Sequence, residues 1–374
     1  MRCGALALLG TGLILAASAP VATASPALVT KRNTAVPTLG NGRVYWASDR
    51  GRRTAIRRSL NGGHRERVFH MSEPGPGARA GIGELSASRS VLAFTAYAEH
   101  RVGRHRRVTR AELLAGPPGG PYVRLTGFRG RDGACRVDRY DPGRVEAGRV
   151  AVYGTAVAYN EIVTDCSRKA RWLEERLVVR SSPTAPPRVL ASCPHPDSLP
   201  ENDEVLIAGD YLAWTPESST CKPLEGLRLF RWRTGRLVYT LRGNDFMEPV
   251  ALRRDGVVVG QWQEPDFNHN NVFDDGGYLA VYRPRPRPHR RLMPRIGYYV
   301  DAVELVGGRL VVQYEPRELS PHSRLAVTDL HARRLRDFAY GLEDSTPWID
   351  FDGSRAVWTV GTTARTVYTS RLPL

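Results

Sequence analysis

Apolar and polar residues alternate along most of the chain with the two-residue period of β-strands. One strand-like pattern recurs seven times, and most copies start with aliphatic residues and end in aromatic or polar ones. The copies are RVYWASD (43–49), VLAFTAY (91–97), VAYNEIV (157–163), YLAWTPE (211–217), VVVGQWQ (257–263), LVVQYEP (310–316) and RAVWTVG (355–361). A second alternating pattern follows each copy, in the order TAIRRSL, AELLAG, RLVVRS, LRLFRWR, YLAVYRP, RLAVTDL and RTVYTSRL.

These patterns repeat about every 50 residues, and each repeat has room for four short strands. Seven copies of a four-stranded unit predict an all-β fold, a seven-bladed β-propeller of four-stranded antiparallel blades. A β-sandwich is the alternative, but it rarely contains seven copies of one four-stranded unit. Helical periodicity is confined to residues 168–176 (RKARWLEER), which form the one plausible helical turn.

Turn dipeptides mark the expected hairpins. Asn41-Gly42, Asp255-Gly256 and Asp352-Gly353 stand between first and second strands, where a two-residue hairpin needs positive φ. Thr234-Gly235 plays a similar part between the third and fourth strands of blade four. These dipeptides support antiparallel strand pairs at the places where the repeat requires them.

The last repeat is one strand short, because only Pro373 and Leu374 follow RTVYTSRL. The segment PALVTKR (26–32) precedes the first strand of blade one. Propellers commonly close their ring with a strand from the other end of the chain, which removes an exposed edge. We therefore expect PALVTKR to complete the last blade.

The first 24 residues have the features of a secretory signal peptide. Arg2 precedes an apolar run at 5–17, and Ala22-Thr23-Ala24 forms a small-x-small cleavage site before Ser25. Cys3 lies ahead of the apolar run, whereas the cysteine of a lipoprotein lies after it, so we expect export without a lipid anchor. We expect residues 25–374 to form a single propeller domain, without a transmembrane segment, outside the cell or at its envelope.

Four cysteines remain after the signal, namely Cys135, Cys166, Cys193 and Cys221. An even number in an exported protein predicts two disulfides, and no spacing matches a zinc site. Three pairings are possible from the sequence alone. In the expected blades, the loop between the second and third strands shares a face with the links between blades. Cys135 and Cys193 fall in links and Cys166 and Cys221 in such loops, which favours the pairs 135–166 and 193–221.

The segment 266–274 (DFNHNNVFD) has the oxygen-donor spacing of a calcium loop. Donors occur at positions one, three, five, seven and nine, where the seventh is a backbone carbonyl; they are Asp266, Asn268, Asn270, Val272 and Asp274. Asn271 takes the sixth position, where a sharp turn usually needs Gly, and Asn tolerates positive φ. Position twelve is Gly277 instead of the Glu of an EF-hand, and both flanks read as strands. The pattern predicts a Ca²⁺ site in a β-hairpin; a polar turn without metal is the alternative.

This loop resembles the Asp-x-Asn-x-Asn-(Gly/Asn)-x-x-Asp hairpins of calcium-binding propellers such as the integrin α-subunit head. The match covers these nine residues, and Asn271 departs from the family's Gly. In its strand pattern over residues 26–374, the chain resembles the bacterial exported propellers grouped as TolB-like or WD40-like. That resemblance implies a binding platform more than an enzyme and does not name the ligand.

The formal net charge is +16, carried almost entirely by arginine. Such a charge attracts polyanions through a salt-screened field. One basic cluster, at 100–110, contains Arg101, Arg104, Arg106, Arg107 and Arg110, and we expect it in a loop on the same face as the calcium loop. A second cluster, at 283–291, alternates Arg with Pro and belongs to the opposite face. Solvated loops without a partner are the alternative for both clusters.

Catalytic motifs are missing from the sequence: it contains no GxSxG elbow, HExxH helix or phosphate-binding glycine loop. Acidic residues lie near the first strands, where propeller enzymes place groups around the central channel; they are Glu84, Asp203, Glu204, Glu248, Asp301, Glu304, Glu343 and Asp344. They are equally well explained as partners of the many arginines, and we assign no catalytic residue.

Two functions therefore remain open. The first is an exported, calcium-stabilised binding module for an anionic envelope polymer or a protein partner. We expect it to be a monomer and do not expect it to bind nucleic acid. The second is a propeller-type hydrolase or lyase acting on an envelope polymer or carbohydrate.

Overall fold

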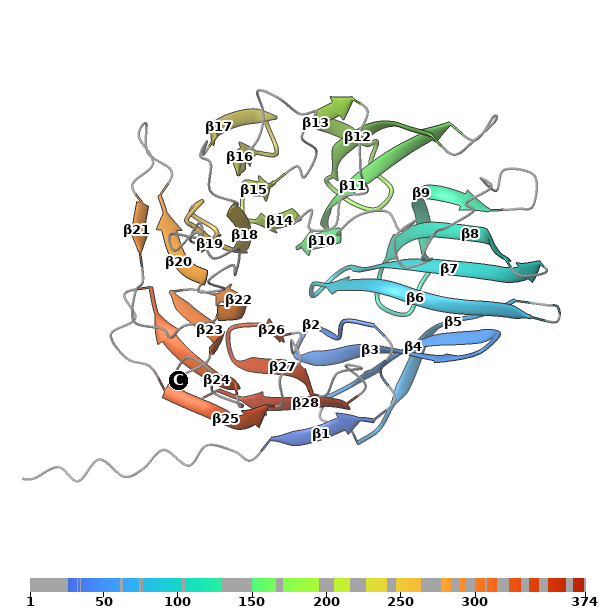
Figure 1. Ribbon diagram of the computed structural model, residues 1–374, viewed down its shortest axis with the longest axis horizontal. Helices are drawn as coiled ribbons and strands as arrows, with labels where there is room; N and C mark the ends of the chain where they lie inside the picture. Colours follow the sequence, from blue (N-terminus) through green and yellow to red (C-terminus); the bar gives the residue numbers. More distant parts are fainter. Residues whose placement is uncertain are drawn as a thin grey trace, which may run out of the picture.

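The structure is a computed structural model. It describes residues 26–31, 33, 35–60, 63–73, 75, 77–102, 105–129, 150–165, 171–194, 205–215, 227–240, 247–263, 277–283, 290–292, 300–306, 308–314, 323–330, 336–342, 349–360 and 366–372. These residues form seven four-stranded antiparallel sheets, arranged like blades around a centre (Figure 1). The predicted seven-bladed β-propeller is confirmed. The described residues contain no helix long and apolar enough to cross a membrane.

The blades are numbered along the chain, and each runs outward from its first strand. Blades one to three are formed by β2 (Thr38–Gly40), β3 (Arg43–Arg50), β4 (Arg53–Ser59), β5 (Glu66–Ser72); β6 (Ala78–Ala87), β7 (Leu92–Val102), β8 (His105–Gly116), β9 (Val123–Arg129); and β10 (Val150–Tyr153), β11 (Ala156–Asp165), β12 (Arg171–Arg180), β13 (Arg188–Pro194).

Blades four to seven follow the same order. They are formed by β14 (Val205–Ala208), β15 (Tyr211–Trp214), β16 (Arg228–Arg231), β17 (Arg236–Thr240); β18 (Met247–Leu252), β19 (Val258–Gln263), β20 (Gly277–Tyr282), β21 (Arg290–Leu292); β22 (Val300–Val306), β23 (Arg309–Tyr314), β24 (Ser323–Asp329), β25 (Arg336–Leu342); and β26 (Ile349–Phe351), β27 (Arg355–Val360), β28 (Thr366–Arg371), β1 (Ala27–Thr30).

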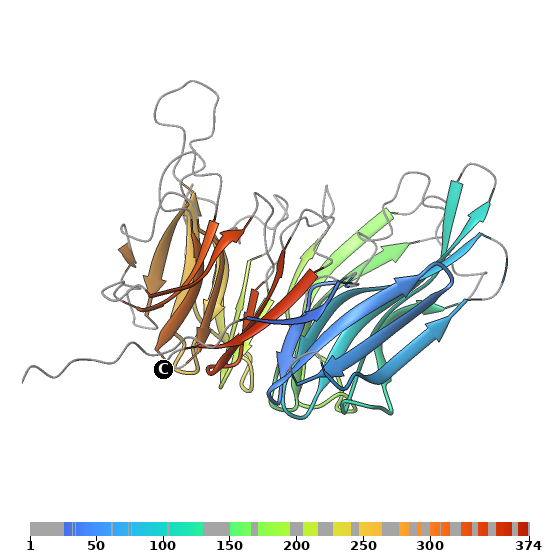
Figure 2. The same ribbon diagram turned by 90° about the horizontal axis from the view of Figure 1, so that it is seen from below.

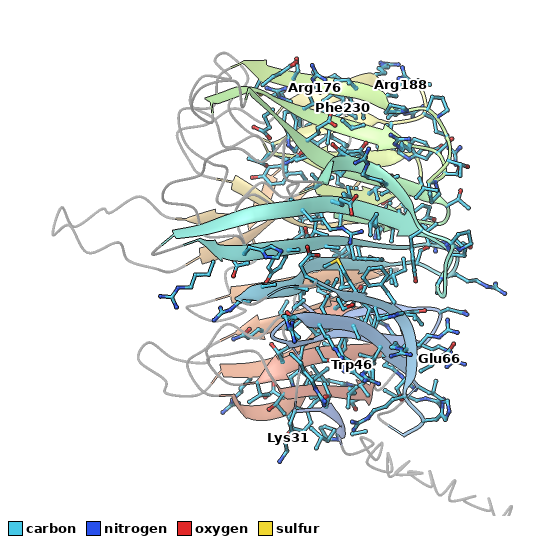
Figure 3. The ribbon with its side chains drawn as sticks, turned by 90° about the vertical axis from the view of Figure 1, so that its right-hand side faces the viewer. Lys31, Trp46, Glu66, Arg176, Arg188 and Phe230 are labelled. Carbon is cyan, nitrogen blue, oxygen red and sulfur yellow. The ribbon has the colours of Figure 1, made fainter. Side chains whose placement is uncertain are left out.

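Second strands are apolar on both faces because each lies between two neighbouring blades. In β3, Val44 and Trp46 pack against Val357 and Val367 of blade seven. The alternate residue Tyr45 belongs to the core shared with blade two. Trp46, labelled in Figure 3, is 1% exposed. A strand buried on both faces reads as a nearly continuous apolar run, which is why the repeat was visible in the sequence.

The N-terminal strand closes the ring as predicted. β1 pairs antiparallel with β28, with Ala27 opposite Thr369 and Leu28 opposite Tyr368. It forms the outer strand of blade seven, beside blade one (Figure 1). Val29 is fully buried in the core between these two blades.

Two local predictions need correction. Asn41 and Gly42, with φ of 53° and 68°, form the expected two-residue hairpin, but β18 and β19 are separated by five residues and β26 and β27 by three. In those longer turns, only Gly256 and Gly353 have positive φ. The helical interpretation of 168–176 was also wrong, because 171–176 belong to β12; residues 168–170 lie outside the described part. Pairing of β12 with β11 and β13 and burial of Leu177 outweigh a weak helical period.

The antiparallel order gives the ring two distinct faces. We call the link face the one that carries the loops between second and third strands and the links between blades, and the turn face the opposite one. Gln263 and Gly277, at the adjoining ends of β19 and β20, and Val102 and His105, at the adjoining ends of β7 and β8, lie on the link face. Tyr282 of β20 and Arg290 of β21, which are opposite each other, lie at the turn face; most of the Arg-Pro cluster lies outside the described residues.

Side chains bind neighbouring blades together at the turn face. Ser88 Oγ of blade two donates to the Gly154 carbonyl of blade three at 2.6 Å. Arg188 of blade three donates to the Thr234 carbonyl of blade four at 2.6 Å. Arg355 of blade seven donates to the Leu60 carbonyl of blade one. These contacts add to the apolar packing between the blades.

Candidate anion-binding site

The predicted calcium segment follows β19 in the sequence and precedes β20. These two strands are paired, with Gln263 opposite Gly277. The predicted ligands Asp266, Asn268, Asn270, Val272 and Asp274 all lie outside the described residues, and Ca²⁺ binding stays a prediction.

Of the four cysteines expected in disulfides, the described residues include Cys193. Cys193 lies near the end of β13, the outer strand of blade three, and not in the link that follows it. Its side chain is fully buried in the core between blades three and four. Cys135, Cys166 and Cys221 lie outside the described residues, so both disulfide pairings stay predictions.

The basic segment at 100–110 is an extended hairpin instead of a loop. β7 continues to Val102 and β8 begins at His105, with Arg101 opposite Arg106. Figure 2 shows the ends of these strands rising beyond the neighbouring blades. Exposed charged strands lack the apolar alternation of core strands, so the pattern was misread.

Two arginines of this hairpin have described side chains. Arg101 is exposed near the end of β7. Arg110 donates to the buried carboxylate of Glu112 and contacts Sδ of Met71 at 2.9 Å. Glu112 therefore compensates the charge of Arg110. Arg104 and the side chains of Arg106 and Arg107 lie outside the described part.

The described carboxylates near the channel bind backbone. Glu84 on β6 accepts a hydrogen bond from the Val150 amide of blade three at 3.0 Å. Asp350 on β26, which the sequence analysis missed, accepts from the Leu39 amide and the Thr38 hydroxyl of blade one, both at 2.6 Å. An acid before an apolar residue on a first strand, as in Glu84-Leu85 and Asp350-Phe351, was the available signal.

The side chains of the other predicted channel acids lie outside the described part of the chain. Glu248 lies on β18, and Asp301 and Glu304 lie on β22, with side chains outside the described part. The remaining members of that set are Asp203, Glu204, Glu343 and Asp344, which lie outside the described residues.

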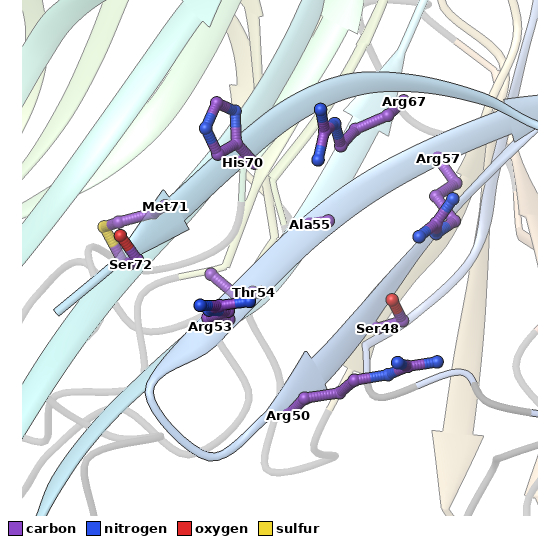
Figure 4. Close-up of a pocket in the computed structure, with 10 residues that line it drawn as sticks. All are labelled: Ser48, Arg50, Arg53, Thr54, Ala55, Arg57, Arg67, His70, Met71 and Ser72. Carbon is purple, nitrogen blue, oxygen red and sulfur yellow. The ribbon is translucent and has the colours of Figure 1, made fainter.

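A cationic pocket that the sequence analysis did not single out lies on blade one. It has a volume of about 490 Å³ and is built on β3, β4 and β5 (Figure 4). Its lining consists of Ser48, Arg50, Arg53, Thr54, Ala55, Arg57, Arg67, His70, Met71 and Ser72. Ser48 and Arg50 alternate with Trp46 along β3, so they lie on the face of the sheet toward blade seven.

The strand register arranges this lining in three rows across the sheet. Nearest the link face, Arg50, Arg53 and Ser72 are opposite one another. Ser48, Ala55 and His70 form the middle row. Arg57 and Arg67 are opposite each other in the third row. The two arginine pairs are thus separated by a row with small side chains at Ser48 and Ala55.

The pocket carries positive charge without a carboxylate among its lining residues. Blade one has three acidic side chains, and each has another partner. Asp49 accepts from the Thr54 hydroxyl. Glu66 binds Arg58 at 2.8 Å, and that contact lowers the pKa of the Glu66 carboxyl. Glu73 lies 3.2 Å from His100 of blade two.

The four pocket guanidinium groups, those of Arg50, Arg53, Arg57 and Arg67, make no hydrogen bond or ion pair with other described residues. All except the half-buried Arg57 are exposed. A cluster of guanidinium groups suits carboxylate, sulfate or phosphate ligands, which they bind with paired N–H donors.

Comparisons with known proteins support the fold. No model of a protein family matches the sequence, and no curated protein matches it. Among solved structures, prolyl oligopeptidase B from Galerina marginata is similar with a TM-score of 0.52 and 12% identity, over 88% of this chain and 47% of that chain. At this identity the likeness concerns the fold alone.

Two further solved structures have lower similarity scores. TolB from Acinetobacter baumannii has a TM-score of 0.40 and 10% identity, over 90% of this chain and 65% of its own. A puromycin hydrolase has a TM-score of 0.42 and 12% identity, over 91% and 62%. The chain thus spans less than two thirds of the length of either protein. No argument is drawn from either likeness.

Proposed function

We propose that this propeller is a binding module for an anionic polymer, and that the cationic pocket of blade one is its main contact. The observation that carries the proposal is the set of four pocket arginines without a described acidic partner. Arg52, in the turn between β3 and β4, donates to the Gly75 carbonyl at 3.4 Å in the link before blade two. Ala78, which begins blade two after that link, is opposite His100 at the start of the basic segment. Blades one and two thus offer neighbouring cationic surfaces.

We further propose the setting that the sequence predicts. The chain is exported after removal of residues 1–24 and acts at or outside the cell envelope, where its partner is an anionic envelope polymer. Ca²⁺ at 266–274 and the two disulfides stabilise the link face. Binding is favoured over hydrolysis because Glu84 and Asp350 use their carboxylates to hold backbone.

Salt dependence of binding tests the proposal. We expect affinity for dextran sulfate to fall roughly 50-fold between about 50 and 200 mM salt if four contacts each contribute about 0.7 to the slope. The double variant Arg50→Ser with Arg53→Ser should reduce that fall to roughly sevenfold, since two contacts remain.

The matched control is Arg89→Ser with Arg236→Ser. Both are exposed, lie outside the pocket and remove the same net charge. Equal losses from the two double variants, measured by titration calorimetry, would show that only net charge is felt and that the pocket is not the site.

A further inference from the structure

The spacing of the two arginine pairs carries information about ligand shape. Arg53 and Arg57 are four residues apart on β4, and strand geometry puts such residues about 13 Å apart along the sheet. Each has an arginine directly across the neighbouring strand, Arg50 for Arg53 and Arg67 for Arg57. Positive charge is therefore concentrated at two positions along one line.

Small side chains form the pocket surface between these two positions. Ala55 stands midway between Arg53 and Arg57 on β4, and Ser48 is directly opposite it on β3. Their small side chains leave room for a ligand to lie along the strand, while the Ser48 hydroxyl and the His70 ring offer hydrogen-bonding groups beside it.

The number and spacing of the positive charges distinguish a polymeric ligand from a single anion. One phosphate group carries a charge of about −1.5 to −2 and would leave about two of the four arginines uncompensated. Bringing all four guanidinium groups to one point also increases their repulsion, because Coulomb energy at about 4 Å is about three times that at about 13 Å. A chain with several anionic groups compensates both pairs where they stand.

The scarcity of aromatic side chains among the lining residues argues against nucleic acid as the ligand. His70 is the sole ring among the lining residues, and Trp46, on the same face of β3 as Ser48 and Arg50, is 1% exposed. Proteins that bind single-stranded nucleic acid stack successive bases on several aromatic side chains, and this pocket has no such platform.

We propose that the pocket binds an extended phosphodiester polymer without nucleobases, lying along β4 with its phosphates held by the two arginine pairs. Arginine is suited to phosphate because its planar fork donates two parallel hydrogen bonds. This inference rests on the proposed function and names the ligand class of the same site.

Synthetic glycerol-phosphate oligomers of increasing length test it, with inorganic phosphate and oligothymidylate of matched charge as comparisons. We expect affinity to rise with length until the oligomer reaches both pairs and then to level off. Arg53→Ser and Arg57→Ser, one from each pair, should each weaken binding of the long oligomer about tenfold. Together they should lower the salt slope by about 1.4.

The controls Arg89→Ser and Arg236→Ser should leave the oligomer affinity nearly unchanged. All variants are compared by thermal melting, which detects any loss of stability, including one at the half-buried Arg57.

Two results would overturn the inference and leave the proposed function standing. Inorganic phosphate that binds as tightly as the long oligomers would make the pocket a single-anion site. Oligothymidylate that binds more tightly than the matched oligomer would make the ligand class wrong. If the pocket variants behave like the controls for every probe, the proposed function fails as well.

Discussion

Asp350 shows how one side chain can hold two blades together. Its carboxylate accepts from the Thr38 hydroxyl and the Leu39 amide across the junction of blades seven and one, and from the Phe351 amide on its own strand, each at 2.6 Å. Burial raises the pKa of Asp350, and these hydrogen bonds oppose the shift without cancelling it.

Replacing Asp350 with Asn should lower the free energy of unfolding by about 1–3 kcal/mol. All three protein groups around the carboxylate are donors, and the amide NH₂ of Asn would face one of them. Urea denaturation measures the loss. Asp352→Asn is the control, because Asp352 lies in the adjacent turn and binds Ser354 and Arg355 locally.

The same pair of proteins should differ in pH dependence. A carboxyl whose pKa is raised by folding contributes stability below its unfolded pKa, near 3.8, and loses that contribution as the pH rises through the folded pKa. The advantage of the parent over Asp350→Asn should therefore be greatest in acid and shrink toward neutral pH. An advantage that grows with pH would contradict the raised pKa.

At the level of elements, β1 determines whether the ring has an exposed edge. It covers β28, and Val29 fills the core between blades seven and one. Deleting residues 25–33 should uncover the β28 edge, lower the melting temperature and cause aggregation, because unpaired strand edges bind other chains. Size-exclusion chromatography and thermal melting measure both effects.

A point substitution in the same strand distinguishes the effect of losing the strand from the effect of changing one of its residues. Leu28 is 42% exposed, so Leu28→Ser should leave melting nearly unchanged. If the truncated protein stays monomeric and melts like the parent, β1 does not close the ring.

Sequence patterns predicted some elements better than others for a physical reason. Second strands such as β3 are buried on both faces, so nearly every position is constrained to be apolar. The outer parts of β7 and β8 leave the ring and lose that constraint, and a charged strand there resembles a loop. In β12, a helix-compatible composition near Arg171 was overridden by pairing on both sides.

For the whole molecule, the number of blades and the closure of the ring followed from periodicity, but the candidate site did not. Its four arginines come from three strands, and Arg67 is brought beside Arg57 by a register shift that the sequence does not reveal. Once the alternation of TAIRRSL is placed on a sheet, Arg53 and Arg57 can be assigned to one face. That no acid lies among the lining residues could be recognised only from the structure, which shows Asp49, Glu66 and Glu73 in contact with other residues.

Calcium should act on the molecule as a whole through blade five. With few carboxylates the predicted site should bind with a dissociation constant of about 10⁻⁴–10⁻³ M, and a hundredfold excess would add roughly 2.7 kcal/mol to stability. EDTA should lower the melting temperature, and Asp266→Ala should abolish that response. Asp255→Ala, on the turn face of the same blade, should keep it. A melting temperature that ignores both EDTA and Asp266→Ala would contradict the site.

The contacts of Ser88, Arg188 and Arg355 with carbonyls of the next blade have a consequence for how such a protein can diversify. They fix neighbouring blades from the turn face, independently of the connections on the other side. Insertions between the ends of β7 and β8 on the link face can therefore create new specificities while the scaffold is inherited intact. Substitutions at Arg188 or Arg355 would instead weaken the contacts between blades and so affect the binding of every ligand.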